Sequence, residues 1–198
     1  MWLDLRLSIV FLWLVRLVSF PPCWRQECVT PIPKDPPSSS VANYLPISIT
    51  SVLSKVFERL VLVHLGRFME RNGVLLTTQF AYRKGLGTCD ALLCVSHTLQ
   101  SALNSGQEDR IEQIDFCAAF DRVNHQGILY RLCSVGIGGA VLSIPSQFLS
   151  NRSQFVMVDD CRSKLVDVVS GVPQGSVLGL LLLFLFTFWS FFPFWKIS

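Results

Sequence analysis

The sequence contains little charge. Only 16% of its 198 residues are Asp, Glu, Lys or Arg, whereas 51% are hydrophobic. The mean hydropathy of +0.45 is high for a soluble domain. The 17 basic and 14 acidic residues leave a net charge of +3, which permits a nucleic-acid partner without arguing for one. The length is enough for one modest domain with a hydrophobic core.

The sequence also lacks the residue spacing of a zinc site, and it has no internal repeat. Its seven cysteines form no Cys-x-x-Cys pair, and no histidine lies near them at zinc-ligand spacing. An odd number of scattered cysteines predicts reduced, buried thiols in an intracellular protein, nuclear or cytoplasmic.

Long uncharged runs occur at the two ends of the sequence. Near the N-terminus, charged residues interrupt the apolar stretch 1–20, its uncharged part 7–15 is too short to span a bilayer, and no small-x-small cleavage site follows. From Val177 to Trp195 no charge occurs over about 19 residues, the length that a membrane span needs. Membrane association through residues 177–195, with a membrane location, is therefore one hypothesis.

Apolar periodicity predicts both helices and strands in this chain. The expected helices are 51–71, 89–105, 126–135 and 140–149, the last kinked or broken at Pro145. The expected strands are 29–34, an edge strand limited by its prolines, and a hairpin of 155–158 and 165–169 with a turn at Asp159 and Asp160. The residues expected to face the core are Leu53, Val56, Phe57, Leu60, His64 and Phe68 in the first helix and Leu92, Val95, Leu99 and Leu103 in the second.

The stretch from Arg110 to His125 places one carboxylate where a metal ion could bind. Its alternation predicts a short strand with Ile114 and Phe116 on the buried face and Asp115 on the open face, and a helix is expected from near Asn124. A carboxylate at the end of a buried strand can hold a divalent cation. From the residues alone, a solvated strand-end aspartate is the alternative interpretation.

Two motifs carry a family resemblance. Gln-Ile-Asp-Phe-Cys-Ala-Ala-Phe-Asp-Arg-Val-Asn-His, from Gln113 to His125, resembles the first catalytic motif of reverse transcriptases from non-LTR (LINE-type) retrotransposons. Ser-Gly-Val-Pro-Gln-Gly-Ser-Val-Leu-Gly, from Ser170 to Gly179, resembles a second motif of that family, in the expected order. The resemblance covers residues 17–185. It includes the Phe-Pro-x-x-Trp turn that ends at Trp24 and two motifs of the fingers subdomain.

The resemblance implies an α+β fold, a partial right-hand polymerase with helical fingers and an incomplete antiparallel palm. The expected divisions are an N-terminal apolar helix and turn over 1–28, a fingers-like region over 29–109, a partial palm over 110–185 and an aberrant apolar tail over 186–198. The helix that starts near Val177 is expected to pack on the core through about Leu185, and the remaining tail is expected to have no partner.

The resemblance also implies roles for individual residues. In this family Mg²⁺ ions serve nucleotidyl transfer, so Asp115 is expected to be a catalytic metal ligand, aided by the carbonyl of Phe116. Phe120 corresponds to the residue that clashes with a ribose 2′-hydroxyl. Contacts to the nucleotide are expected from Lys34, Phe120 and Gln174, and contacts to the template from Arg83, Lys84 and Gly175, the last in a loop whose backbone can approach a base pair.

The sequence departs from the family at several points. Leu45 stands where the family has an arginine, Asp160 where it has glycine, and Glu112 where it has an aliphatic residue. After 185 the family continues to Tyr/Phe-Ala-Asp-Asp, which this sequence lacks, and the Phe-rich end is interpreted as a damaged reading frame. The leading hypothesis is a fragment of an RNA-directed DNA polymerase, inactive by itself, that once bound an RNA template and a DNA primer. A non-catalytic nucleic-acid-binding remnant and a small membrane-associated protein are the alternatives.

Overall fold

The computed structural model describes residues 11, 12, 14, 16, 19–34, 39–75, 78–81, 83, 85–106, 108, 110, 111 and 113–191. The chain forms two compact units. The first combines Met1–Leu62 with Ala118–Ser198, and the second is Val63–Cys117. The four-part division expected from the family stays a prediction.

The chain combines helices with a mixed sheet, so the expected combination of helix and strand is confirmed, while the right-hand polymerase architecture stays a prediction. The elements are η1 (Pro22–Trp24), β1 (Gln26–Pro33), η2 (Val41–Asn43), β2 (Tyr44–Ile49), α2 (Val52–Arg71), α3 (Thr88–Asn104), α4 (Ala119–Arg122), α5 (His125–Ser134), α6 (Gly139–Leu149), β3 (Arg152–Val158), β4 (Cys161–Arg162), β5 (Val166–Val168) and α7 (Val177–Phe191).

Strand β1 is an interior strand of the sheet, so its expected place at an edge is wrong. The strand order is β2-β1-β3-β4, and β5 also pairs with β3. β1 runs antiparallel to β2 and parallel to β3, and that parallel pair makes the sheet mixed where an antiparallel one was expected. β1 pairs with β3 only from Gln26 to Val29, before Pro31 and Pro33. Pro31 and Pro33 have no N–H group to donate, but they lie beyond the paired residues, so no hydrogen bond to β3 is lost.

The predicted turn at Asp159 and Asp160 is present, but it joins β3 to β4. The predicted strand 165–169, seen as β5, pairs with residues 152–154 and not with 155–158. β3 begins earlier than expected, at Arg152, and its first half pairs antiparallel with β5, while its second half pairs with β4. At the turn between β3 and β4, Asp159 and Asp160 have φ of 45° and 64°. Two successive positive φ angles are the conformation that favours Gly at the second position, which explains why the family has glycine at position 160.

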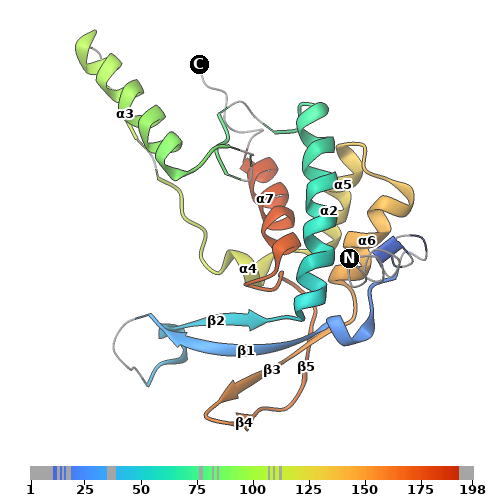
Figure 1. The fold of residues 1–198 in the computed structure, drawn as a ribbon. Helices are drawn as coiled ribbons and strands as arrows, with labels where there is room; N and C mark the ends of the chain where they lie inside the picture. Colours follow the sequence, from blue (N-terminus) through green and yellow to red (C-terminus); the bar gives the residue numbers. More distant parts are fainter. Residues whose placement is uncertain are drawn as a thin grey trace, which may run out of the picture. The chain divides into compact units, whose positions relative to one another are not determined.

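The core of the first unit joins the N-terminal turn to the helices. The rings of Phe20 and Trp24 pack edge to face at 5.5 Å, and Phe20 packs in the same way on Phe148 of α6. Helix α5 packs on both α6 and α7, whose positions are shown in Figure 1. Helix α6 runs through Pro145, which is buried, so the expected break is absent.

Helix α7 is buried along its first turns, as expected. Leu178, Leu181, Leu182 and Leu185 are at most 2% exposed. The helix is described over Val177–Phe191, 15 residues, and residues 192–195 of the expected membrane span lie outside the described part of the chain. In the described ranges no helix is both long enough and apolar enough to cross a membrane, and a span over 177–195 is not supported.

The buried stripe of α2 differs from the expected one. Leu53, Val56 and Leu60 are exposed by 43–46%, and His64 is exposed, so its expected place in the core is wrong. The buried residues of α2 are Ser54, Phe57, Glu58, Val61, Leu65 and Met69. Because the polar residues Ser54 and Glu58 are buried, the buried stripe lies about one residue further along the helix than the apolar periodicity indicates.

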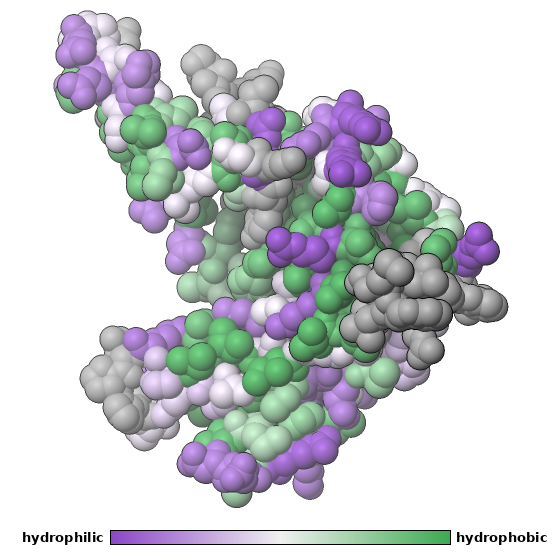
Figure 2. Space-filling model, in the orientation of Figure 1, coloured by the Kyte–Doolittle hydropathy of each residue, from purple (hydrophilic) through white to green (hydrophobic). Residues whose placement is uncertain are grey.

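In the second unit, α3 lies open to solvent. None of its residues is buried, and Leu92, Val95 and Leu103, which were expected to face inward, are 67%, 49% and 75% exposed. Figure 2 shows hydrophobic and hydrophilic side chains together on its surface. The helix ends at Asn104, just before Gly106, as predicted.

The seven thiols are free, but they are not buried as expected. Cys28 is half-buried, and the other six are exposed.

Candidate functional site

The two family motifs meet in the first unit through backbone hydrogen bonds. The N–H of Val172 donates to the carbonyl of Phe120 at 2.7 Å, and the N–H of Gly171 donates to that of Val123 at 2.8 Å. Gly171 has φ +83°, and a Cβ there would lie 2.5 Å from the carbonyl oxygen of Phe120 and 2.8 Å from Cα of Asp121. Only glycine allows this approach. Glycine is therefore needed at position 171 so that the two motifs can pack against each other.

Side chains add two further bonds between the same segments. The Ser170 hydroxyl donates to the carbonyl of Asp121 at 3.0 Å, and Nε2 of His125 lies 2.7 Å from the carbonyl oxygen of Gly171. A carbonyl only accepts, so that ring nitrogen carries the proton. Helix α5 starts at His125 because the side chain of Asn124 caps it, accepting from the N–H of Gly127. The cap fixes the place of His125 at the first turn, and the predicted helix start is confirmed.

The second motif also contacts β2. The N–H of Ser48 donates to the carbonyl of Gln174 at 2.8 Å. Gly175 has φ +126°, and a Cβ there would lie 2.8 Å from the carbonyl oxygen of Ser48. The loop 170–176 is thereby held between β2 and the segment 120–125.

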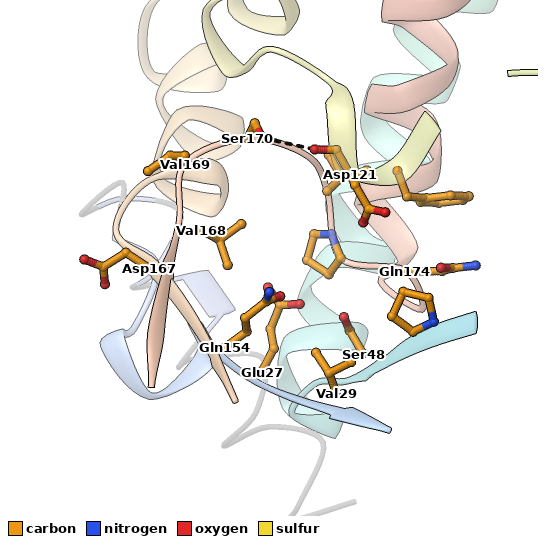
Figure 3. A pocket seen from close by; sticks show the side chains of 14 residues that line it. Glu27, Val29, Ser48, Asp121, Gln154, Asp167, Val168, Val169, Ser170 and Gln174 are labelled. Carbon is orange, nitrogen blue, oxygen red and sulfur yellow. Dashed lines mark hydrogen bonds between the residues drawn. The ribbon is translucent and has the colours of Figure 1, made fainter. Parts of the chain in front are cut away.

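These three segments and the sheet line an open cavity of about 380 Å³ (Figure 3). Its lining residues are Glu27, Val29, Pro46, Ser48, Phe120, Asp121, Gln154, Asp167, Val168, Val169, Ser170, Val172, Pro173 and Gln174. Phe120 and Gln174, two of the three residues expected at the nucleotide, both line it. The structure thus brings together two predicted site residues from separate motifs.

The charge of the cavity is one-sided. Glu27, Asp121 and Asp167 line it, and none of the lining residues is Lys or Arg. Glu27 and Gln154 are register partners on β1 and β3, and their side chains lie side by side in Figure 3. The lining therefore offers hydrogen-bond acceptors and amide groups, which suit neutral polar groups better than phosphates.

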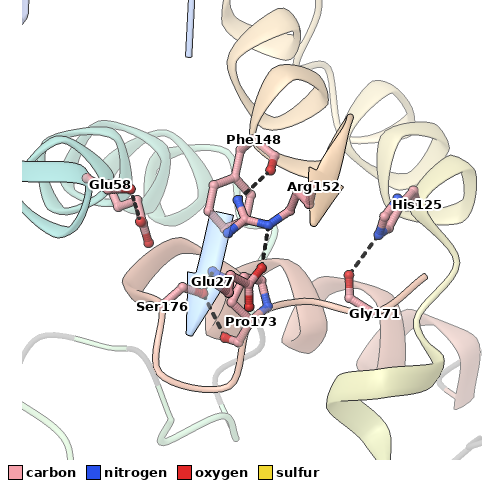
Figure 4. A network of polar contacts seen from close by, with 10 residues as sticks. Glu27, Glu58, His125, Phe148, Arg152, Gly171, Pro173 and Ser176 are labelled. Atoms are coloured by element: carbon pink, nitrogen blue, oxygen red, sulfur yellow. Dashed lines mark hydrogen bonds and ion pairs between the residues drawn. The ribbon is translucent and has the colours of Figure 1, made fainter. Parts of the chain in front are cut away.

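A buried ion pair joins Glu27 of the cavity lining to Arg152 (Figure 4). Nε of Arg152 donates to Oε1 of Glu27 at 2.7 Å, and Nη1 donates to the carbonyl of Phe148 at 2.9 Å. The guanidinium also stacks 4.9 Å above the Phe148 ring. Sequence reasoning missed this pair, since its members lie far apart in the chain. The only feature of the local sequence that pointed to the pair was a charged residue on an otherwise half-buried strand.

Asp115 does not lie on a strand. Residues 113–116 have no regular structure, and Ile114 and Phe116, expected on a buried face, are 53% and 40% exposed. Asp115 itself is exposed. Glu112 lies outside the described residues.

In the described residues, Asp115 has no cluster of metal-binding side chains around it. Within those residues, no three His, Cys, Asp or Glu side chains gather as a metal ion would require. A Mg²⁺ ion held by one carboxylate takes its other oxygens from water or substrate phosphates. Asp115 and Phe116 as metal ligands therefore stay predictions.

The expected basic contacts lie outside the cavity lining. Lys34 is exposed just after β1, where its N–H donates to the carbonyl of Asn43. Arg83 is half-buried in the second unit, and Lys84 lies outside the described residues.

Comparison with known proteins decides the family. The model of the family "Reverse transcriptase (RNA-dependent DNA polymerase)" matches residues 32–194. The chain belongs to the reverse transcriptase family. It is 34% identical over 184 residues to the probable RNA-directed DNA polymerase from transposon X-element of Drosophila melanogaster, a match that covers 92% of this chain and 20% of that protein.

Two further relatives come from mobile elements of the same species. The identity is 31% to the probable RNA-directed DNA polymerase from transposon BS, with 92% of this chain and 20% of the relative covered. It is also 31% to the RNA-directed DNA polymerase from mobile element jockey, with 87% and 19% covered. This reverse transcriptase chain thus spans about a fifth of the length of these relatives. The expected assignment to a reverse transcriptase domain of a non-LTR retrotransposon is confirmed.

Proposed function

We propose that this chain is part of an RNA-directed DNA polymerase and that its cavity receives the sugar and base of the incoming deoxynucleotide. The observation that carries the proposal is the shared place of Phe120 and Gln174, from two separate motifs, in one cavity. Its volume of about 380 Å³ is in the range of small-molecule sites. We also propose that the protein acts inside the cell, where nucleic acids are synthesised.

The cavity's groups suit this role. The Phe120 ring would fill the space that a ribose 2′-hydroxyl needs, and so would favour deoxynucleotides. The Gln174 side chain is half-exposed and offers both a donor and an acceptor to the sugar or base. The acidic lining would repel the triphosphate, so the phosphates would point away from it.

The other partners are an RNA template and a DNA primer. Arg83 and Lys84 would contact phosphates of the template through charge-assisted hydrogen bonds, with Gly175 close to the terminal base pair. Lys34, exposed beyond the cavity, would meet the triphosphate.

The family's Mg²⁺ would supply activation of the primer hydroxyl and stabilisation of pyrophosphate. In the described residues, no three His, Cys, Asp or Glu side chains gather for these ions. We propose that the 198-residue chain binds primer, template and nucleotide without extending the primer.

The test is a binding measurement. A fluorescent RNA template annealed to a DNA primer with a dideoxy end is titrated with the protein. The apparent Kd is measured under three conditions: with the complementary deoxynucleotide, with a mismatched deoxynucleotide and without any nucleotide. We expect the complementary nucleotide alone to lower Kd. Gln174→Ala should remove that response, and Gln100→Ala, an exposed glutamine on α3, should keep it. Equal Kd values with complementary and mismatched nucleotides would contradict the proposal.

A further inference from the structure

Two polar side chains of α2 are buried at the start of α7, although no motif points to them. Ser54 and Glu58 are each 1% exposed. The Ser54 hydroxyl donates to Oε1 of Glu58 at 2.7 Å. Oε2 of Glu58 accepts from the backbone N–H groups of Val177 at 2.8 Å and Leu178 at 3.1 Å. A carboxylate is tolerated inside a protein only where its oxygens accept hydrogen bonds, and here both oxygens do.

Glu58 completes the cap of α7. The first N–H groups of a helix have no partner within it. At α7 the hydroxyl of Ser176 accepts from the N–H of Gly179 at 3.1 Å, which is an ordinary N-terminal cap. The two N–H groups between them bind Glu58, which comes from another helix. The positive end of the helix dipole attracts the same carboxylate.

The capped end directly follows the turn that carries Gln174. The Ser176 hydroxyl donates to the carbonyl of Pro173 at 2.9 Å (Figure 4). The carbonyl of Gln174 accepts from Ser48 of β2. The turn 173–176 is therefore fixed at one end by β2 and at the other by Glu58.

We infer that Glu58 is a positioning residue for nucleotide binding: it holds the start of α7 so that Gln174 faces the cavity. This inference rests on the proposed function. Glu58 is not among the cavity's lining residues, so its effect on a nucleotide passes through the turn 173–176.

The test combines amide hydrogen exchange with the nucleotide response defined above. Glu58→Gln keeps the size of the side chain but replaces one acceptor oxygen with a donor. We expect exchange at Val177 and Leu178 to accelerate on the order of tenfold beyond any global change, as the loss of a hydrogen bond to a charged group implies. The tightening by complementary deoxynucleotide should fall by a similar factor, while Kd for primer and template alone stays unchanged.

Two variants make the result specific. Leu149→Val, in the core of α6, should lower stability and accelerate exchange throughout the unit without a selective effect at 174–178. Ser54→Ala removes only the hydrogen bond that orients the carboxylate, and should give a smaller change of the same kind. It replaces Glu58→Gln if that variant does not fold.

The outcomes separate the two proposals. If exchange at 174–178 changes no more than elsewhere, or if the nucleotide response survives Glu58→Gln intact, the positioning role is wrong. If the wild-type protein shows no nucleotide response, the proposed function fails. Exchange at Gln174 and Gly175 then decides whether Glu58 holds the turn.

Discussion

The carboxylate of Glu27 and the guanidinium of Arg152 form a 2.7 Å ion pair between two parallel strands, with at most 2% of either side chain exposed. Because Arg152 also donates to the carbonyl of Phe148, the pair connects the sheet to α6 as well as β1 to β3. One wall of the cavity thus depends on a charge pair that water does not reach.

Breaking this pair on one side should be costly. Arg152→Met leaves the Glu27 charge buried without its partner, and we expect a loss of about 3–5 kcal/mol of unfolding free energy. Urea unfolding followed by circular dichroism measures it. The double variant Glu27→Gln with Arg152→Met should lose much less, because no charge stays buried. Equal losses in the single and double variants would show that the unpaired Glu27 charge is not what destabilises Arg152→Met.

Gly171→Ala should destabilise the fold by roughly 2–5 kcal/mol, since a left-handed backbone costs about 1–2 kcal/mol and an overpacked contact about 1–3 kcal/mol. The strain comes from φ +83° and from the carbonyl of Phe120 at 2.5 Å. Gly138→Ala is the control, because its φ is −139° and a Cβ there meets nothing within 4 Å. Thermal unfolding of both variants tests the difference; similar melting temperatures would contradict the contact.

Asp160→Gly should stabilise the β3–β4 turn by about 0.5–1 kcal/mol, because glycine adopts φ 64° without strain. The melting temperature should rise by a few degrees. Asp160→Ala keeps the strain and removes the polar side chain, so its melting temperature should not rise. An unchanged or lower value for the glycine variant would mean that the aspartate side chain stabilises the turn.

Phe120→Ala should weaken the distinction between deoxy- and ribonucleotides, because the half-buried ring lines the cavity where the sugar is proposed to bind. The measurement is the change in primer–template Kd caused by complementary deoxy- or ribonucleotide. In the wild-type protein only the deoxynucleotide should act, and in the variant both should. A variant that still rejects ribonucleotides would remove Phe120 from this role.

The 198-residue protein should extend no primer in Mg²⁺. Asp115 is exposed, and a divalent ion that binds about six oxygens finds no three clustered acidic, His or Cys side chains in the described part of the chain. A gel assay with labelled primer tests this expectation. Extension that depends on Mg²⁺ and that Asp115→Asn abolishes would overturn it.

The sequence predicted well whatever is local or carried by a motif. The capped helix start at Asn124, the turn at Asp159 and Asp160, and the place of Phe120 and Gln174 in one site follow from residue chemistry or from family order. Each depends on neighbours within a few residues or on a known motif.

Predictions that depended on distant partners were less accurate. The alternation from Ile111 to Phe116 resembles a strand, but no strand forms there, because pairing and burial decide β structure more than local pattern does. Periodicity also placed Leu60 in the core and Glu58 outside it, whereas the structure has the reverse. A buried glutamate becomes plausible only when its partners at the start of α7 are known.

The parallel pairing of β1 with β3 governs the order of folding events. Cys28 pairs with Phe155, so this part of the sheet closes only after the ribosome has synthesised the chain beyond residue 155. Until then β1 can pair with β2 alone, and the edge that later binds β3 is open to other chains. Contacts between such distant segments slow folding. Chain concentration during synthesis and refolding therefore determines the share of molecules that reach the native sheet before they aggregate.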